Sequence, residues 1–140
     1  MQHYQALVVD DDPENRYILD LSFRNINWID PIKILDSTER LLNYLHALPD
    51  SCFYPSLIVL NYDMQKRNGA EVLTLLKQQE SFKHIPVVIY AKSMSPLLRE
   101  KLLTMGALSC YQESEPEQIA TLVAHIRALA ETLPELPKPY

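Results

Sequence analysis

The sequence predicts a doubly wound α/β domain, in which a five-stranded parallel sheet lies between two layers of helices. Five short apolar runs alternate with segments whose apolar residues recur at helical spacing. Runs such as 57–60 are apolar throughout, as expected of parallel strands that helices cover on both faces. The runs 6–9 and 57–60 are followed by Asp10-Asp11-Asp12 and by Asn61. These polar ends predict a pocket at the carboxyl edge of the sheet, where open α/β sheets place their sites.

The first half of the chain predicts two strands and two helices. Residues 6–9 form the first strand, and Asp12 followed by Pro13 is a suitable N-cap and first turn for the helix after it. Residues 32–35 form the second strand, and Asp36 or Ser37 begins the next helix. The residues expected to face the core are Tyr17, Ile18, Leu21 and 23–26 in the first helix, and Leu41, Leu42 and Leu45 in the second.

The middle of the chain predicts a loop, a strand, a helix and a further strand. Residues 49–55 have the composition of a loop, and 57–60 form the third strand. Asn-Gly pairs often form hairpins. Here, however, Asn68-Gly69 precedes a helical pattern and predicts a turn into a helix. That pattern consists of Val72, Leu73, Leu75 and Leu76. Pro86 then opens the β-branched fourth strand.

The last part of the chain predicts a helix, a weaker strand and a final helix. Ser95-Pro96 is a good start for a helix that reaches Met105, and Gly106 fits its C-terminal end. Residues 107–111 predict the fifth strand and 115–131 the last helix. The apolar residues of this helix are Ile119, Leu122, Val123, Ile126, Leu129 and Ala130.

Composition limits the class of protein. A chain of 140 residues suits one domain, residues 1–132, followed by a Pro-rich tail at 133–140. A formal net charge of −5 argues against nucleic acid as a partner. The N-terminus is not a signal peptide, and no apolar run reaches the length of about 20 residues needed to cross a bilayer. We therefore expect a cytoplasmic protein without a membrane partner.

The cysteines and histidines predict no metal site. Cys52 and Cys110 lack the spacing of a metal site or of a disulfide framework, so both are expected to be free thiols. His3, His46, His84 and His125 are scattered over different elements, and none is expected to bind a metal or take part in catalysis.

Four stretches together resemble receiver domains of two-component response regulators. They are 8–13, 57–69, 84–89 and Gly106-Ala107, and the resemblance extends from Ala6 to about Leu129. It implies the flavodoxin-like strand order 2-1-3-4-5.

The resemblance also implies the positions of a phosphorylation site. In the family, two acidic residues bind magnesium, an aspartate accepts the phosphoryl group, and a Ser or Thr and a Lys contact that group. Asp10 and Asp11 match the acidic pair, and Asp63 would offer a backbone carbonyl to the metal, so that its side chain matters less. The other positions depart from the family. The acceptor position is Asn61, the hydroxyl position Ala91, the lysine position Glu113 and the aromatic switch position Cys110.

The changed positions alter the expected charge of the pocket. A complete family site has three carboxylates and one lysine, whereas Asp10, Asp11 and Glu113 are all acidic here. Crowded carboxylates raise one another's pKa unless a cation intervenes. We expect Lys92 to supply that cation, with no cofactor required and magnesium bound weakly or not at all. The alternative is that Glu113 points to solvent.

These expectations give three hypotheses for function. The first is a receiver-like signalling module, not an enzyme, that is not phosphorylated and acts by protein–protein interaction. Its partners would be a histidine kinase or an output protein that binds the face formed by helix four, strand five and helix five, and the chain would be a monomer or weak homodimer. The second is a receiver phosphorylated on Asp10 or Asp11. The third is a metal-dependent phosphohydrolase, for which no nucleophile or general base is convincingly placed.

Overall fold

The fold alternates strands with helices along the whole described chain. The computed structural model describes residues 3–26, 31–115 and 117–133. The elements are β1 (Ala6–Val9), α1 (Pro13–Asn25), β2 (Ile32–Leu35), α2 (Thr38–Ala47), the 3-10 turn η1 (Ser51–Phe53), β3 (Leu57–Asn61), α3 (Gly69–Lys77), β4 (Val87–Ala91), α4 (Pro96–Thr104), β5 (Ser109–Gln112) and α5 (Gln118–Thr132). The tail at 134–140 lies outside the described residues.

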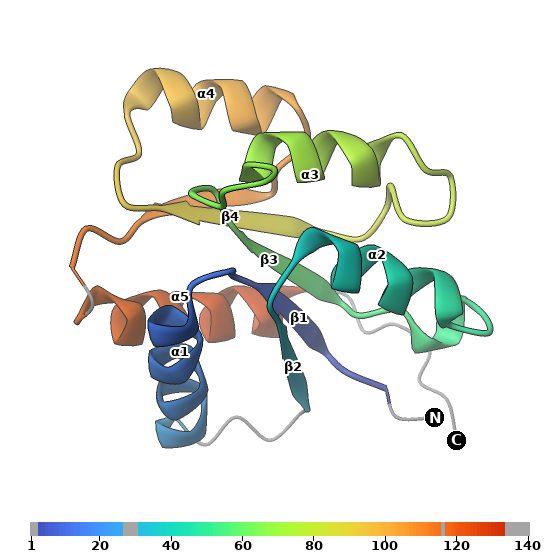
Figure 1. Cartoon of the computed structure of the whole chain (residues 1–140), viewed down its shortest axis with the longest axis horizontal. Coiled ribbons are helices and arrows are strands. Elements are labelled where there is room, and N and C mark those ends of the chain that lie inside the picture. The colour runs from blue at the N-terminus through green and yellow to red at the C-terminus, as the bar shows by residue number, and fades with distance from the viewer. Residues whose placement is uncertain (1–2, 27–30, 116, 134–140) are drawn as a thin grey trace.

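The five strands form one parallel sheet in the order β2-β1-β3-β4-β5, which confirms the predicted topology (Figure 1). The register pairs Val9 with Leu60, and Asn61 with Tyr90. All five strands therefore end at one edge, on the left of Figure 1, where the loops to the helices begin.

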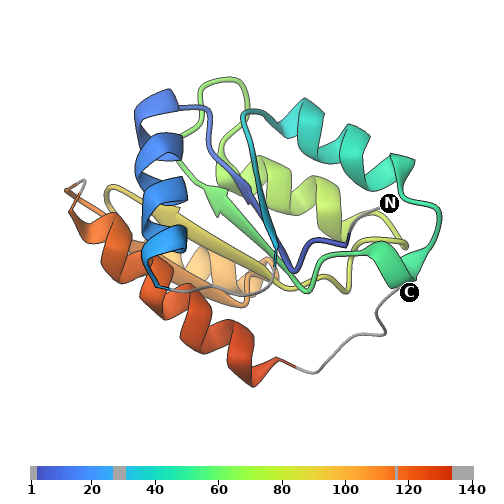
Figure 2. The ribbon, with the colours of Figure 1, turned by 90° about the horizontal axis from the view of Figure 1, so that it is seen from below.

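Each face of the sheet buries its own core because successive side chains on a strand point to opposite sides. On β1, Leu7 and Val9 pack with residues of α2, α3 and α4. Ala6 and Val8 instead pack with residues of α1 and α5. Figure 2 shows α1 and α5 side by side on their face, and a hydrogen bond of 2.5 Å from Arg127 to the carbonyl of Ile26 joins the two helices.

Side-chain caps fix where four of the helices begin. Asp12 accepts hydrogen bonds from the backbone amides of Glu14 and Asn15 at the start of α1. Ser37 and Ser95 cap α2 and α4 in the same way. Asn68 and Glu71 form a reciprocal capping box at the start of α3. These starts agree with the sequence predictions, since the capping signals are local.

Two glycines are required by backbone geometry. Gly106 has a φ of 111°, which ends α4 in a conformation that residues with a Cβ rarely adopt. Gly69 lies so close to β3 that an added Cβ would be 2.9 Å from the Cα of Tyr62. This close approach sets the start of α3 directly over the end of β3.

The predicted core residues of α1 were right in part: Phe23 is buried and Ile18 packs against the same core, but two other predicted residues are exposed. Leu19 and Phe23 are buried, whereas Tyr17 is 67% exposed and Leu21 is 40% exposed. The buried pair is spaced by four residues and faces the core that α1 shares with α5. The prediction included Tyr17 and Leu21, which lie on a more exposed side of the helix, and omitted Leu19. Element boundaries also differ: β5 is Ser109–Gln112 and not 107–111, and α5 is Gln118–Thr132 and not 115–131.

The corrected stripe can be tested by comparing two leucines of α1. Leu19→Ala should lower the free energy of unfolding by about 2–5 kcal/mol, because it leaves a cavity in a fully buried site. Leu21→Ala should change it by only about 0.5 kcal/mol, because its side chain is largely in solvent. Urea denaturation of both variants measures the difference. Equal losses of unfolding free energy in the two variants would show that Leu21 faces the core, as the sequence predicted.

Candidate functional site

Four side chains form a row across the carboxyl edge of the sheet. Val8, Val59 and Val88 lie in the core beneath α1 and α5, and Asp10, Asn61 and Tyr90 follow them by two residues on the same face. Glu113 likewise follows Tyr111 of β5 by two residues, and Tyr111 packs against that core. The row therefore draws one residue from each of β1, β3, β4 and β5, or from the position just beyond the strand.

Asp10 is the centre of this row. Its side chain has no exposed surface, and both carboxylate oxygens accept hydrogen bonds from protein groups. Oδ1 accepts from the backbone amide of Asp12 at 2.9 Å and from Nδ2 of Asn61 at 3.1 Å. Oδ2 accepts from Nδ2 of Asn15 at 3.2 Å and from the hydroxyl of Tyr90 at 2.5 Å. Burial raises the pKa of Asp10, and these donors oppose the rise because they stabilise the ionised form.

Asn61 uses both ends of its amide. While its Nδ2 donates to Asp10, its Oδ1 accepts a hydrogen bond of 3.0 Å from the backbone amide of Asp63. The side chain is only 5% exposed. An ionised aspartate could accept from Asp63 in the same manner but could not donate to Asp10. The amide at this position therefore matches its surroundings in a way that a carboxylate would not.

Tyr90 is a site residue that the sequence analysis missed. Its hydroxyl donates to Asp10 from within β4, a strand whose sequence is β-branched and almost wholly apolar. Burial and the neighbouring Asp10 raise its pKa well above the usual range, so Tyr90 remains a neutral donor. The available signal was the hydroxyl itself, because a buried tyrosine usually needs a hydrogen-bond partner.

The other predicted acidic ligands hold loops together. Asp11 accepts at Oδ2 from the backbone amide of Gln65, which lies in the loop after β3, at 2.9 Å. Asp63 accepts at Oδ2 from the backbone amide of Lys92, which lies in the loop after β4, also at 2.9 Å. The expectation that the side chain of Asp63 matters little was therefore wrong. It joins the loop after β3 to the loop after β4.

Glu113 is buried at the far end of the row, with 4% of its surface exposed, and does not extend into solvent. Burial raises the pKa of its carboxyl, the nearby Asp10 raises it further, and Lys92 opposes the rise. Glu113 also contributes to the raised pKa of Tyr90. Its carboxyl therefore lies near enough to Asp10 and Tyr90 to act on both electrostatically.

Lys92 does not form the direct pairing expected of a pocket cation. Its side chain is exposed, and within the described ranges its ammonium has no carboxylate within 4.0 Å. Only its electrostatic effect on Glu113 remains. Its backbone forms two hydrogen bonds: the amide of Lys92 donates to Asp63, and the hydroxyl of Ser114 donates to the carbonyl of Lys92. These backbone contacts leave the side chain outside the row.

The two other predicted positions lie beside the row and are apolar. Ala91 is fully buried at the end of β4 and offers no hydroxyl. Cys110 is 1% exposed, and Nη1 of Arg99 in α4 donates to its carbonyl at 2.6 Å. Tyr111, next to Cys110, stacks on His125 of α5 with ring centroids 5.4 Å apart. The aromatic ring of this strand thus faces α5 and is offset by one position from the expected switch residue.

A divalent metal does not fit the residues at this edge. Magnesium would need free carboxylate oxygens, but both oxygens of Asp10 are occupied by four protein donors, and Asn61 directs an amide N–H at the same carboxylate. Among residues 3–26, 31–115 and 117–133, no three His, Cys, Asp or Glu side chains are grouped so that they could hold a metal ion. The structure therefore favours internal hydrogen bonds where the resemblance implied a metal site.

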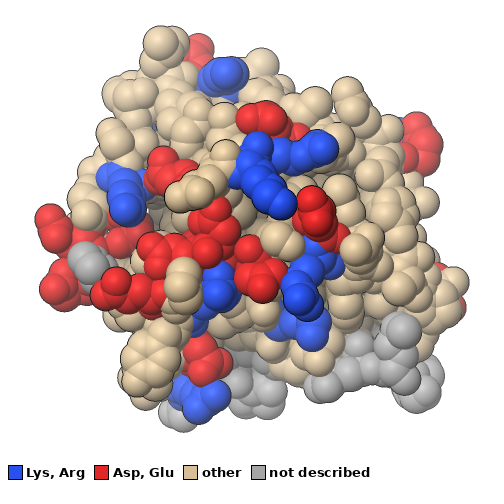
Figure 3. All heavy atoms as spheres, in the orientation of Figure 1, with Lys and Arg blue, Asp and Glu red and all other residues tan. Residues whose placement is uncertain are grey.

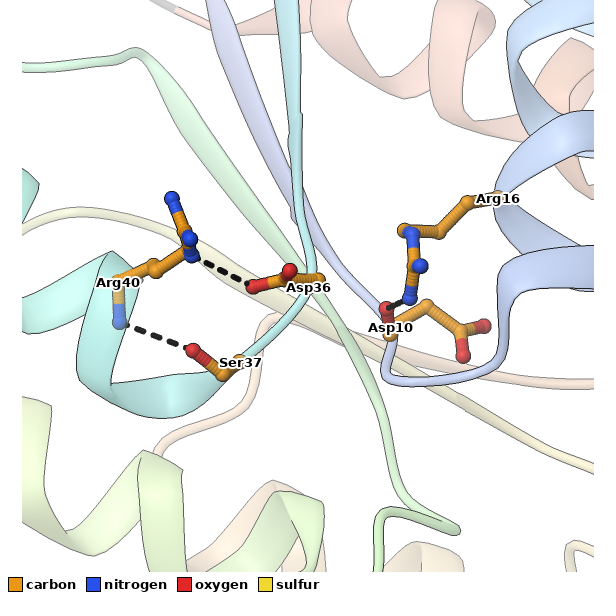
Figure 4. A network of polar contacts seen from close by, with 5 residues as sticks. All are labelled: Asp10, Arg16, Asp36, Ser37 and Arg40. Carbon is orange, nitrogen blue, oxygen red and sulfur yellow. Dashed lines mark hydrogen bonds and ion pairs between the residues drawn. The ribbon is translucent and has the colours of Figure 1, made fainter.

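The loops around the row are tied to the helices and carry much acidic charge. Figure 4 shows Arg16 of α1 donating from Nη1 to the backbone carbonyl of Asp10 at 3.0 Å, and Arg40 paired with Asp36 near the start of α2. Figure 3 shows acidic side chains gathered at the left of the molecule, where the strands run into these loops. Asp63 and Glu115 are among the exposed acidic residues of this edge.

Comparison with known families identifies the family and the fold. Residues 6–127 match the family model described as the response regulator receiver domain. The chain belongs to the response regulator receiver domain family. Receiver domains are signalling modules of two-component systems that interact with histidine kinases and output domains.

Solved receiver structures share the fold at low identity. The phosphorylated cyanobacterial phytochrome response regulator RcpA is 19% identical, with a TM-score of 0.79 over 98% of this chain and 100% of that one. The Mn(2+)-bound form of response regulator Rcp1 is 22% identical, with a TM-score of 0.75 over 93% of this chain and 98% of that one. Response regulator RPA3017, from red light signaling of R. palustris, is 23% identical, with a TM-score of 0.74 over 96% of this chain and 99% of that one.

Comparison with curated protein sequences finds no significant match. In the described part of the receiver domain, no helix has the length and apolar character that crossing a membrane requires.

The burial of Glu113 predicts a pH-dependent stability difference. An acid whose pKa is raised by folding stabilises the fold fully below its ordinary value, 4.5 here, and that contribution is lost as the pH rises through the raised value. Glu113→Gln mimics the protonated form. Its Tm should equal that of the unchanged protein near pH 4, exceed it as the pH rises through the raised pKa of Glu113, and stay higher by a constant amount above that pH.

The matched control for this prediction is Glu115→Gln, which makes the same change of charge at an exposed residue of the same loop. Thermal unfolding of the three proteins across pH 4–8 gives the comparison. A Tm difference for Glu113→Gln that stays constant over this range would show that the Glu113 carboxyl does not resist ionisation.

Proposed function

We propose that this receiver domain is not phosphorylated at position 61 and signals through protein–protein contacts. The observation that carries the proposal is the amide of Asn61, which donates to Asp10 and accepts from the backbone of Asp63. An acceptor carboxylate must be free to attack phosphorus. The amide is a poor nucleophile, and both of its ends are already engaged.

The neighbours of Asn61 support the same proposal. Phosphoryl transfer depends on positioned cations and donors that stabilise the developing charge. Ala91 offers no hydroxyl, and Glu113 places a carboxylate where the family has a lysine. The Asp10 carboxylate is bound by the Tyr90 hydroxyl. The chemistry that this edge favours is hydrogen bonding within the protein.

The alternative acceptors have less support from the geometry. Asp10 has no exposed surface, and both of its oxygens accept hydrogen bonds. Asp11 is partly exposed, but one of its oxygens accepts from Gln65. A phosphohydrolase would need a metal and a nucleophile, and the described residues group no metal ligands here. Phosphorylation of Asp10 or Asp11 is one outcome of the first experiment below.

The proposed contact surface is the face formed by α4, β5 and α5. Leu97 at the start of α4 is 78% exposed, and Leu108 before β5 is 43% exposed. Exposed leucines of this kind suit a kinase, an output protein or a weak homodimer as partner. The proposal keeps the cytoplasmic setting and the boundary at residue 132 that the sequence predicts.

The first test is chemical phosphorylation. Incubation with acetyl phosphate and magnesium should leave the intact mass unchanged, because Asn61 cannot form an acyl phosphate. A receiver domain with an aspartate acceptor serves as the positive control. The appearance of one added phosphoryl group mapped to Asn61, Asp10 or Asp11 would overturn the proposal, and the mapped residue would identify the acceptor.

The second test is reversion of the changed positions. Asn61→Asp alone should remain poorly reactive toward acetyl phosphate, because like charges a few ångströms apart repel by about 1–4 kcal/mol and Glu113 and Asp10 stay in place. Adding Ala91→Thr and Glu113→Lys should increase the rate by much more than the product of the separate effects, since all three residues act on one transition state.

The matched control is the double variant Ala91→Thr/Glu113→Lys, which keeps Asn61 and should not react at all. Rates come from the intact mass as a function of time. A single reversion as reactive as the triple variant would show that the neighbouring groups do not limit the reaction.

A further inference from the structure

The unpaired carboxylate of Glu113 is the least explained feature of the site. The side chain is 4% exposed, yet within the described ranges no hydrogen-bond donor or basic group contacts its oxygens. Asp10, the other buried acid of the row, has four donors. Because a buried carboxylate without a partner is costly, Glu113 indicates a partner that comes from outside the described chain.

An outside group can reach these oxygens. Among the described residues, the hydroxyl of Tyr44 is the only fully enclosed side-chain oxygen or nitrogen without a partner. The oxygens of Glu113, which also lack a partner, are therefore not completely enclosed. The opening is narrow, because so little of the side chain is exposed. A slender group fits it better than a bulky one.

The surroundings determine the charge of that group. Asp10, Asp63 and Glu115 all act on Glu113 as like charges, and only Lys92 opposes them. Asp63 and Glu115 are exposed at the rim, and the hydrogen bond of Asp63 to Lys92 uses only its Oδ2. The partner is therefore a cation that can satisfy Glu113 and the free oxygen of Asp63 together.

We propose that Glu113 and Asp63 form a binding site for a lysine or arginine side chain of a partner protein. A basic side chain is slender, carries its charge at the tip and forms charge-assisted hydrogen bonds with carboxylates. A divalent ion would need further anionic ligands, and Asp10 has no free oxygen to give. This inference deepens the proposed function, because it names the chemistry of the contact at the former phosphorylation edge.

The experiment uses the blocked tripeptide acetyl-Ala-Lys-Ala-amide, with norleucine in place of lysine as the neutral control. The whole chain, isotope-labelled, is titrated with each peptide while the side-chain carboxyl carbons and backbone amides are followed by NMR. The lysine peptide should shift the Glu113 carboxyl signal with saturation, and the norleucine peptide should not. An arginine peptide compares the two basic groups.

Two matched variants locate the binding. Glu113→Gln should lower the affinity for the lysine peptide about tenfold or more, because it removes the buried charge. Glu115→Gln should change the affinity for the same peptide by about twofold or less. Both variants exchange one carboxylate for an amide in the same loop. The backbone amide spectrum of each variant checks that it is folded.

Several results would overturn the inference. Equal losses in both variants would indicate general attraction to the acidic surface, and equal shifts with norleucine would indicate an uncharged contact. Absence of any shift would also reject the site. None of these results affects the acetyl phosphate experiment. A phosphorylated product would reject the proposed function while leaving the peptide result to stand or fail separately.

Discussion

Burial of the Asp10 carboxylate is the constraint on which the rest of the site depends. A carboxylate without exposed surface requires donors, and it receives them from four places: the turn after β1, helix α1, strand β3 and strand β4. This requirement accounts for Asn61 and Tyr90 together. An aspartate at position 61 would replace a donor with a second acceptor, so the amide has a structural role in addition to the loss of nucleophilicity.

The acidic residues that the family devotes to metal binding hold loops in place in this chain. Asp11 binds the amide of Gln65, and Asp63 binds the amide of Lys92. The hydroxyl of Ser114 completes the set by donating to the carbonyl of Lys92. The loops after β1, β3, β4 and β5 are therefore connected by direct hydrogen bonds. These contacts between protein groups hold the four loops together at this edge.

Local signals in the sequence were enough to predict most of the fold. The bounds 6–9 and 32–35 were predicted as observed, and the helix starts at Ser95 and Asn68 follow from capping chemistry that acts over three residues. Which apolar residues of α1 face the core was not fully predictable in this way. Adjacent apolar stripes on one helix differ only in which one meets the rest of the protein, and contact with α5 decides the choice.

The placement of the polar residues of the row at one edge of the sheet was predictable, but the contacts among them were not. The resemblance assigned Asp10, Asn61 and Glu113 to one edge, and the parallel register brings them together. Tyr90 could not be assigned, because its importance depends on lying beside Asn61 in the neighbouring strand. Sequence pattern alone treats it as one more apolar residue of β4.

Compared with the pattern of the family, Asn61 and Glu113 change the charge of the row in opposite directions and at different places. Asn61 removes a negative charge from the middle of the row, where Asp10 is already fully hydrogen-bonded. Glu113 adds one at the end of the row, beside the exposed Asp63 and Glu115. Together they leave the unsatisfied negative charge at the end of the row, next to the exposed acidic rim of Asp63 and Glu115. Negative charge in this place attracts approaching cations, which supports the proposal that this edge recognises a basic partner.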